Sequence, residues 1–143
     1  MKQENDKNFA DKHTGKTPNA RIEAEITTKI INGELPCVLA FDIATRLNIK
    51  PAEVGVTCDL MNLKISKCQL GLFGYHLEHK VASGKKEPVA LLKDALMAAQ
   101  FNHRITCETA WNIAAELKVG KIAVGNGCEA LGIKIKACQL GVF

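Results

Sequence analysis

The chain has 143 residues, of which 47% are hydrophobic and 5% aromatic, and its formal net charge is +4. This hydrophobic content is ordinary for a globular protein, and the mild positive charge permits nucleic-acid binding without demanding it. The chain shows no apolar run of signal-peptide type and no apolar stretch of membrane-spanning length, so we expect a cytoplasmic protein with reduced thiols and no membrane partner.

An internal repeat with an offset of seventy residues organises the chain. The sequence Cys-Gln-Leu-Gly-Leu-Phe at 68–73 returns as Cys-Gln-Leu-Gly-Val-Phe at 138–143. From Cys37 to Phe73, 15 of 37 positions are identical to their counterparts, and no gap is needed. The pattern indicates a tandem duplication.

The duplication predicts a division of the chain into four parts. They are a polar, disordered tail at 1–17, a first repeat at 18–73, a linker at 74–87 and a second repeat at 88–143. Repeats of this size sit at the low end for independent stability. We therefore expect them to share a core or to form a homodimer.

The first repeat opens with a predicted helix. The Thr-Pro-Asn sequence at 17–19 supplies a capping hydroxyl and a proline for the first helical turn. Ile22, Ile26 and Ile30 follow at four-residue spacing and form one apolar stripe. The Asn-Gly pair at 32–33 is expected to end this helix.

Two further helices are predicted in each repeat. The second begins at Pro36 in the first repeat and is capped by Thr106 in the second. The third begins at Pro51, a residue suited to a first helical turn. Gly55 and Gly125 occupy the same position of this third helix in the two copies, which indicates a close backbone approach there.

A strand closes each repeat. Leu63 and Ile65 alternate with polar residues, but after Lys67 the phase shifts and Cys68 and Leu70 become the apolar set, which indicates a bulge or sharp bend. A single strand cannot satisfy its own backbone hydrogen bonds, so we expect the strand of one repeat to pair with that of the other. The predicted fold is mainly α with a small amount of β.

Two stretches resemble the helix-turn-helix motif. They lie at 43–54 and 113–124, and each has alanine in its first helix, an apolar residue in the turn and valine early in its second helix. With the preceding helix and the following strand, each repeat looks like a trihelical domain with a reduced wing, as in winged-helix proteins. The resemblance implies a DNA-binding, transcription-regulatory role.

The third helix lacks the residues that usually read bases in this family. The first repeat has Pro51, Ala52 and Glu53 at the positions that would face the major groove. We therefore expect contacts with the nucleic-acid backbone to come mainly from basic side chains on the strands. The candidate nucleic-acid-binding residues are Lys64, Lys67, Lys121, Asn126, Lys134 and Lys136.

The cysteines recur with the spacing Cys-x20-Cys-x9-Cys in both repeats. Each is in phase with apolar neighbours, so the favoured interpretation is a set of small core residues. A metal or iron–sulfur site, or a redox-active pair, is the alternative interpretation. The ligands would then come from Cys37, Cys58, Cys68, Cys107, Cys128 and Cys138. His76 and His79 of the linker form a weaker metal-binding candidate.

The sequence shows no arrangement typical of catalysis: it has no nucleophile elbow, no Gly-rich phosphate loop and no suitably spaced carboxylate pair. We therefore expect neither enzymatic activity nor a cofactor. The leading hypothesis is a small DNA-binding or regulatory protein. The alternatives are a non-catalytic module that binds a protein partner and, third, a cysteine-based metal or redox sensor.

Overall fold

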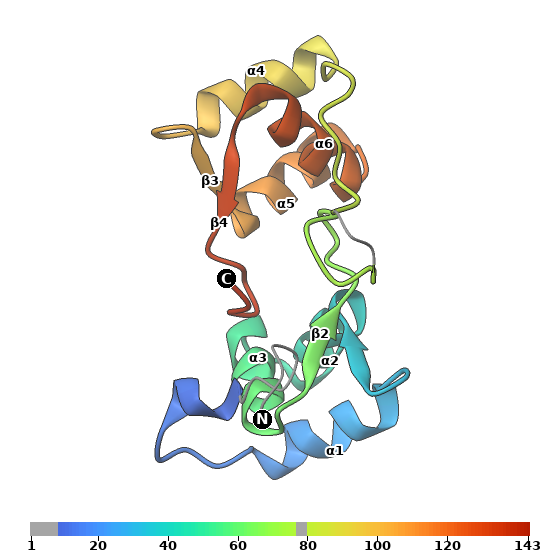
Figure 1. Cartoon of the computed structure of the whole chain (residues 1–143), viewed down its shortest axis with the longest axis vertical. Helices are drawn as coiled ribbons and strands as arrows, with labels where there is room; N and C mark the ends of the chain where they lie inside the picture. The colour runs from blue at the N-terminus through green and yellow to red at the C-terminus, as the bar shows by residue number, and fades with distance from the viewer. Residues whose placement is uncertain (1–8, 77–79) are drawn as a thin grey trace, which may run out of the picture. The chain divides into compact units, whose positions relative to one another are not determined.

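The computed structural model describes residues 9–76 and 80–143. These residues form a mainly helical structure with a few short strands (Figure 1). Among them, no helix is long and apolar enough to span a membrane. The chain divides into two compact units, unit 1 with Met1–Ser66 and Leu140–Val142, and unit 2 with Lys67–Gln139 and Phe143.

The helices and strands of unit 2 follow their counterparts in unit 1 by seventy residues. Unit 1 contains η2 (Phe9–His13), α1 (Ala20–Lys29), β1 (Glu34–Pro36), α2 (Cys37–Leu47), α3 (Pro51–Leu60) and β2 (Lys64–Ser66). Unit 2 contains α4 (Ala90–Ala99), β3 (Arg104–Thr106), α5 (Cys107–Leu117), α6 (Lys121–Leu131) and β4 (Lys134–Lys136). The 3-10 helix η2 lies in the stretch expected to be a disordered tail, whose first eight residues fall outside the described part.

The helix α1 starts later than predicted. Its N-cap is Asn19, whose side-chain oxygen accepts hydrogen bonds from the backbone N–H groups of Arg21 at 3.0 Å and Ile22 at 3.1 Å. The expected cap, Thr17, lies two residues before it. The cap predicted for α5 is confirmed, because the hydroxyl of Thr106 accepts the backbone N–H of Thr109 at 3.0 Å.

The strands pair within each unit, so the predicted pairing between repeats is wrong. β1 lies parallel to β2, and β3 lies parallel to β4. The middle residues of each pair are buried, Ile105 beside Ile135 in unit 2, and they anchor the two-stranded ribbon on the core. The backbone groups of β2 and β4 thus find their hydrogen-bond partners in the same unit. The partner is the short strand that precedes α2 or α5.

The predicted bend after each closing strand is confirmed. Lys67 and Ala137 have φ angles of 50° and 53°, in the left-handed region, and so the alternation of the strand is broken there. The chain then makes a tight turn, in which Gly71 donates its N–H to the carbonyl of Cys68 at 2.9 Å. This turn segment belongs to unit 2, whereas Leu140–Val142 of the corresponding segment belongs to unit 1.

The close backbone approach predicted at the two helical glycines is also confirmed. A Cβ atom at Gly125 would overlap the carbonyl oxygen of Leu70 within unit 2. A Cβ atom at Gly55 would overlap the carbonyl oxygen of Leu140 within unit 1. Each glycine therefore makes room for the backbone of a Cys-Gln-Leu-Gly segment, and the leucine of that segment is buried beside it.

Candidate nucleic-acid interface

A tight two-residue turn joins α4 to β3 in unit 2. Phe101 and Arg104 exchange both backbone hydrogen bonds across this turn, at 2.9 Å and 3.0 Å. Asn102 and His103 between them both have left-handed φ angles, 52° and 61°, as in a type I′ hairpin turn. Because Phe101 and Arg104 lie directly opposite each other, their side chains point to the same face of the hairpin.

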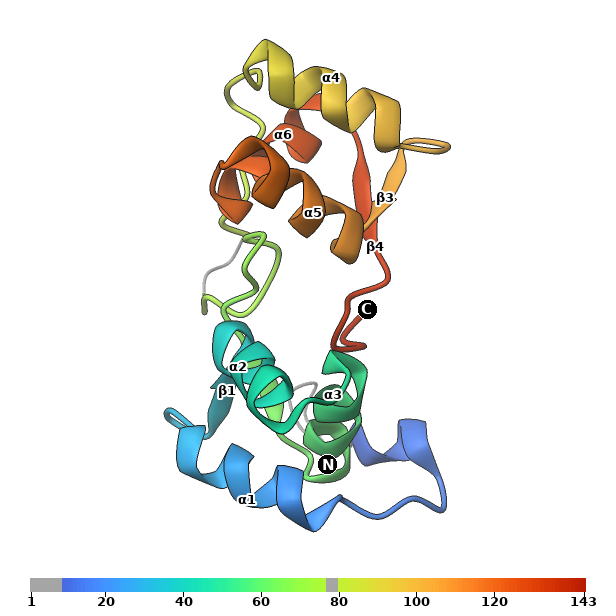
Figure 2. The same cartoon turned by 180° about the vertical axis from the view of Figure 1, so that it is seen from behind.

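The pairing of β3 with β4 extends this face. β3 and β4 lie side by side (Figure 2). Lys134 is the register partner of Arg104, and Lys136 is the partner of Thr106. Side chains that are two residues apart on a strand share a face, so Lys136 follows Lys134 on the outer side while Ile135 points into the core. The side chains of this outer side are exposed, and we call them the ribbon face: Phe101, Arg104, Lys134 and Lys136.

The ribbon face places like charges side by side. Arg104 and Lys134 are direct neighbours across the ribbon, an arrangement that destabilises a sheet relative to neutral or opposite-charge pairs. The corresponding pair in unit 1 is Glu34 beside Lys64, which is balanced. The position of Lys136 is taken in unit 1 by Ser66, which is buried. Unit 2 thus carries a cationic row where unit 1 does not, and such a row suits an anionic ligand.

The other predicted site residues lie elsewhere. Lys64 is on β2 in unit 1, and Lys67 directly follows β2 with a left-handed φ angle. The ammonium group of Lys121 lies 4.5 Å from the centroid of the Trp111 ring, a cation–π contact. The side-chain oxygen of Asn126 accepts the backbone N–H of Ser83 at 2.8 Å, and it thereby fixes the end of the linker on α6.

The third helix of each unit is largely occupied by packing. In α6, Val124, Gly125, Gly127 and Cys128 are all buried. Gly127 contacts side chains of α4, where Leu96 approaches within 3.0 Å of the position a Cβ would take. A helix that is used on several sides for packing presents little surface to the major groove.

The third helix of unit 1 is also engaged at both ends. Near its end, Asp59 accepts from the ring of His13 at 2.8 Å and forms an ion pair with Lys12 at 3.2 Å, both of them from η2. At its start, the carboxylate of Glu53 accepts the backbone N–H of Lys50 at 3.1 Å and completes a cap. These polar groups therefore serve the fold of unit 1.

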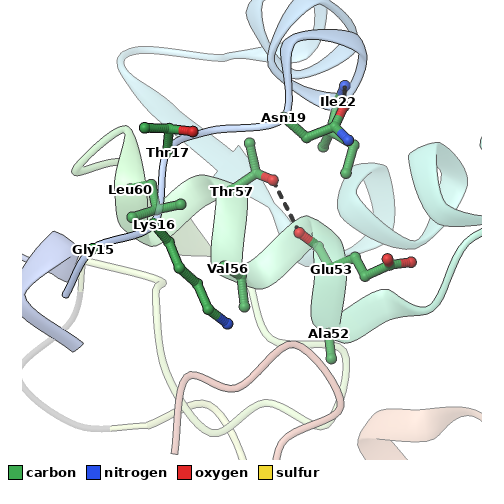
Figure 3. Close-up of a pocket in the computed structure, with 10 residues that line it drawn as sticks. All are labelled: Gly15, Lys16, Thr17, Asn19, Ile22, Ala52, Glu53, Val56, Thr57 and Leu60. Atoms are coloured by element: carbon green, nitrogen blue, oxygen red, sulfur yellow. Dashed lines mark hydrogen bonds between the residues drawn. The ribbon is translucent and has the colours of Figure 1, made fainter. Parts of the chain in front are cut away.

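A shallow hollow of about 490 Å³ lies along α3 in unit 1 (Figure 3). Its lining includes the apolar side chains of Ile22, Val56 and Leu60 and the charged side chain of Lys16. The hydroxyl of Thr57 donates to the backbone carbonyl of Glu53 at 3.0 Å, as the dashed line in Figure 3 shows. The lining is mixed, because it also includes the polar side chains of Thr17 and Asn19 and the carboxylate of Glu53.

The cysteines are mostly buried, as the core interpretation predicts. Five of the six are buried, and Cys138 is half-buried. Burial raises the pKa of the Cys58 thiol to about 12, and the carboxylate of Asp59 adds to the shift. Burial likewise raises the pKa of Cys128 to about 12, with Glu129 adding to it. These thiols stay neutral at physiological pH and pack as small apolar groups.

Residues 9–76 and 80–143 contain no preformed cluster of metal-binding side chains. Within those ranges, no group of three or more His, Cys, Asp or Glu side chains is placed to hold a metal ion. Cys68 and Cys107 both have a pKa raised by burial, and the side chain of Gln139 donates to the Cys107 sulfur at 3.5 Å. Of the linker histidines, His79 falls outside the described residues.

The two thiols with the largest pKa shifts predict a loss of stability at alkaline pH. Below about pH 9 these thiols are neutral in both states, whereas between pH 9 and pH 12 they ionise only in the unfolded chain. Each should lower the free energy of unfolding by about 1.4 kcal/mol per pH unit in that window. Urea unfolding from pH 8 to 10.5 measures this loss. The variant with both Cys58→Ala and Cys128→Ala should show a flatter pH dependence, and an unchanged slope would contradict the assignment.

Sequence reasoning missed Phe101 and Arg104. Both belong to the turn and strand before α5, a segment whose three strand residues are too few for an alternation signal. The difference between the two copies could have identified these residues. Ile31 and Glu34 of the first repeat correspond to Phe101 and Arg104 of the second. The two copies therefore differ in charge and in aromatic character at this turn and ribbon.

Comparisons of the chain with protein-family models, with curated proteins and with solved structures find no match.

Proposed function

We propose that this chain is a non-catalytic nucleic-acid-binding protein with a regulatory role, which contacts the phosphate backbone through the ribbon face. In this proposal the two units are diverged helix-turn-helix-like repeats whose third helices have become structural. The observation that supports it most is the row of three exposed cations, Arg104, Lys134 and Lys136, on one side of a two-stranded ribbon.

The chemistry of the row fits phosphate. The guanidinium of Arg104 can donate two parallel hydrogen bonds to a phosphate, and the two lysines add mobile point charges. Lys134 and Lys136 are two residues apart on one strand, so their Cα atoms are roughly 6.6 Å apart. A ligand with several regularly spaced negative charges engages all three side chains at once, whereas a single small anion does not.

Charge-neutralising variants test this proposal. The triple variant Arg104→Gln, Lys134→Gln, Lys136→Gln should bind a fluorescent 20-base-pair duplex much more weakly than the wild type in anisotropy titrations at 50 mM salt. For the wild type, the logarithm of the affinity should fall with the logarithm of the salt concentration at a slope of about −2 to −3, since each phosphate contact contributes about −0.9. Each neutralised side chain should reduce that slope by about 1.

Lys64→Gln provides the matched control. Lys64 occupies the position of Lys134 in the other ribbon, but its register partner is Glu34. This variant should therefore bind nearly as tightly as the wild type. If the wild type binds neither the duplex nor a single strand at low salt, or if the triple variant binds equally well, the proposed function is overturned.

A second candidate function is a protein-interaction module, and a specific surface favours it. Val89, Leu91 and Met97, on and beside α4, are 69%, 72% and 45% exposed. Their counterparts in the first repeat are the polar residues Asn19, Arg21 and Thr27. Exposed apolar side chains at positions that are polar in the first repeat favour a protein partner. Sedimentation at increasing protein concentration, with Leu91→Arg for comparison, shows whether this face self-associates.

A further inference from the structure

We propose that Phe101 is a stacking platform for an unpaired base, and that the ribbon face therefore prefers single-stranded nucleic acid to duplex. This inference rests on the proposed function and names the form of its ligand. Three features carry it: the exposure of the Phe101 ring, the rigidity of the backbone that holds it, and its place beside the cations.

Phe101 is 77% exposed although it is one of the few aromatic residues of the chain. Its backbone is fixed on both sides of the tight turn by the two hydrogen bonds with Arg104. The side-chain oxygen of Gln100 also accepts the backbone N–H of His103 at 2.8 Å and braces the turn. The ring is thus held in solvent by an ordered turn, which lowers the entropy cost of placing a base on it.

The position of the ring relative to the cations matches a nucleotide. Phe101, Arg104 and Lys134 lie in a row across adjacent backbone segments, since Phe101 is opposite Arg104 and Arg104 is the register partner of Lys134. Proteins that bind single strands combine such basic tracks with aromatic rings on which bases stack. In a duplex the bases stack on one another and their faces are closed to the ring, so only the phosphates remain available to this surface.

The first repeat shows what this surface looks like without the two features. Ile31 occupies the position of Phe101 and is 52% exposed, but it has no π-face. Glu34 occupies the position of Arg104 and would repel a phosphate. The two repeats therefore differ at both positions together, as expected if one ligand contacts the ring and the cation of the second repeat.

Stacking gives a direct spectroscopic test with the full-length protein. A twelve-nucleotide oligothymidine with one central 2-aminopurine should change its fluorescence on binding, because stacking alters the emission of this base. An oligonucleotide with an abasic site at the same position keeps every phosphate and should bind more weakly. The wild type should bind the single strand at least about fivefold more tightly than a duplex of the same length at 100 mM salt.

Variants at Phe101 separate stacking from simple apolar contact. Phe101→Leu should weaken binding of the single strand by roughly 5- to 50-fold and abolish the 2-aminopurine signal, while duplex affinity stays unchanged. Phe101→Trp should preserve both the affinity and the signal. Phe101 is exposed, so circular dichroism should show that these variants fold like the wild type.

The outcomes that overturn the inference differ from those that overturn the proposed function. If the wild type binds no oligonucleotide at 50 mM salt, the proposed function fails and the inference fails with it. If it binds single strand and duplex equally and Phe101→Leu changes neither, only the inference is overturned. If Phe101→Leu instead alters self-association in sedimentation and leaves oligonucleotide binding intact, the ring belongs to a protein-docking surface and the inference is also overturned.

Discussion

Replacing Leu140 with lysine should unfold unit 1. Leu140 is 2% exposed, and its backbone carbonyl lies against Gly55 of α3. A lysine there would either bury an ammonium group without a partner or pull the segment off the helix. Either outcome should lower the free energy of unfolding by at least about 4 kcal/mol, a large part of the stability of a small protein. Urea unfolding followed by circular dichroism measures the loss.

Val142→Lys is the matched control, because Val142 lies in the same segment and is 40% exposed. It should change stability by less than about 0.5 kcal/mol. Leu70→Lys is the companion variant in unit 2, where Leu70 is fully buried in the core cluster. If Leu140→Lys unfolds at the same urea concentration as the wild type, the segment is not part of the core of unit 1.

Gly125→Ala should destabilise the protein by about 3 kcal/mol, the upper end of the usual cost of overpacking. The sign is informative, because alanine inside a helix is normally better than glycine by about 1 kcal/mol. Here the added Cβ would overlap the carbonyl oxygen of Leu70, so the backbone of that segment has to move away from α6. Thermal and urea unfolding of the variant both report the loss.

The control for this substitution is Gly120→Ala. Gly120 immediately precedes α6, its φ is −66°, and nothing lies within 4 Å of the position its Cβ would take. Alanine should cost less than about 1 kcal/mol there, the usual effect of a weaker N-cap. If Gly125→Ala stabilises the protein as helix propensity alone predicts, the close approach of Leu70 to α6 is wrong.

The helices were predictable where an apolar stripe or a recognisable start marks them. Pro51 begins α3 and Thr106 caps α5, as the sequence indicates. The strand pairing was not predictable in the same way. Glu34–Pro36 is a strand of three residues with proline at its end, a pattern typical of a helix start, and so the true partner of Lys64–Ser66 was overlooked.

Only part of the candidate site could be predicted from the sequence. Lys134 and Lys136 were predicted as basic strand residues, and the structure places them on one face. Arg104 joins them through strand register, which composition does not reveal. Asn126 was expected to be available because of the helix-turn-helix resemblance, but it holds Ser83 of the linker. No local pattern in the linker signals that its end packs on α6.

We propose that nucleic acid binds the ribbon face and not the third helix. The most direct measurement is the amide chemical-shift perturbation of ¹⁵N-labelled protein titrated with a twelve-nucleotide oligonucleotide at low salt. Under this proposal, the largest shifts are expected at residues 101–106 and 134–136, with little change at 121–126. Shifts concentrated at 121–126, or none at saturating oligonucleotide, would contradict it.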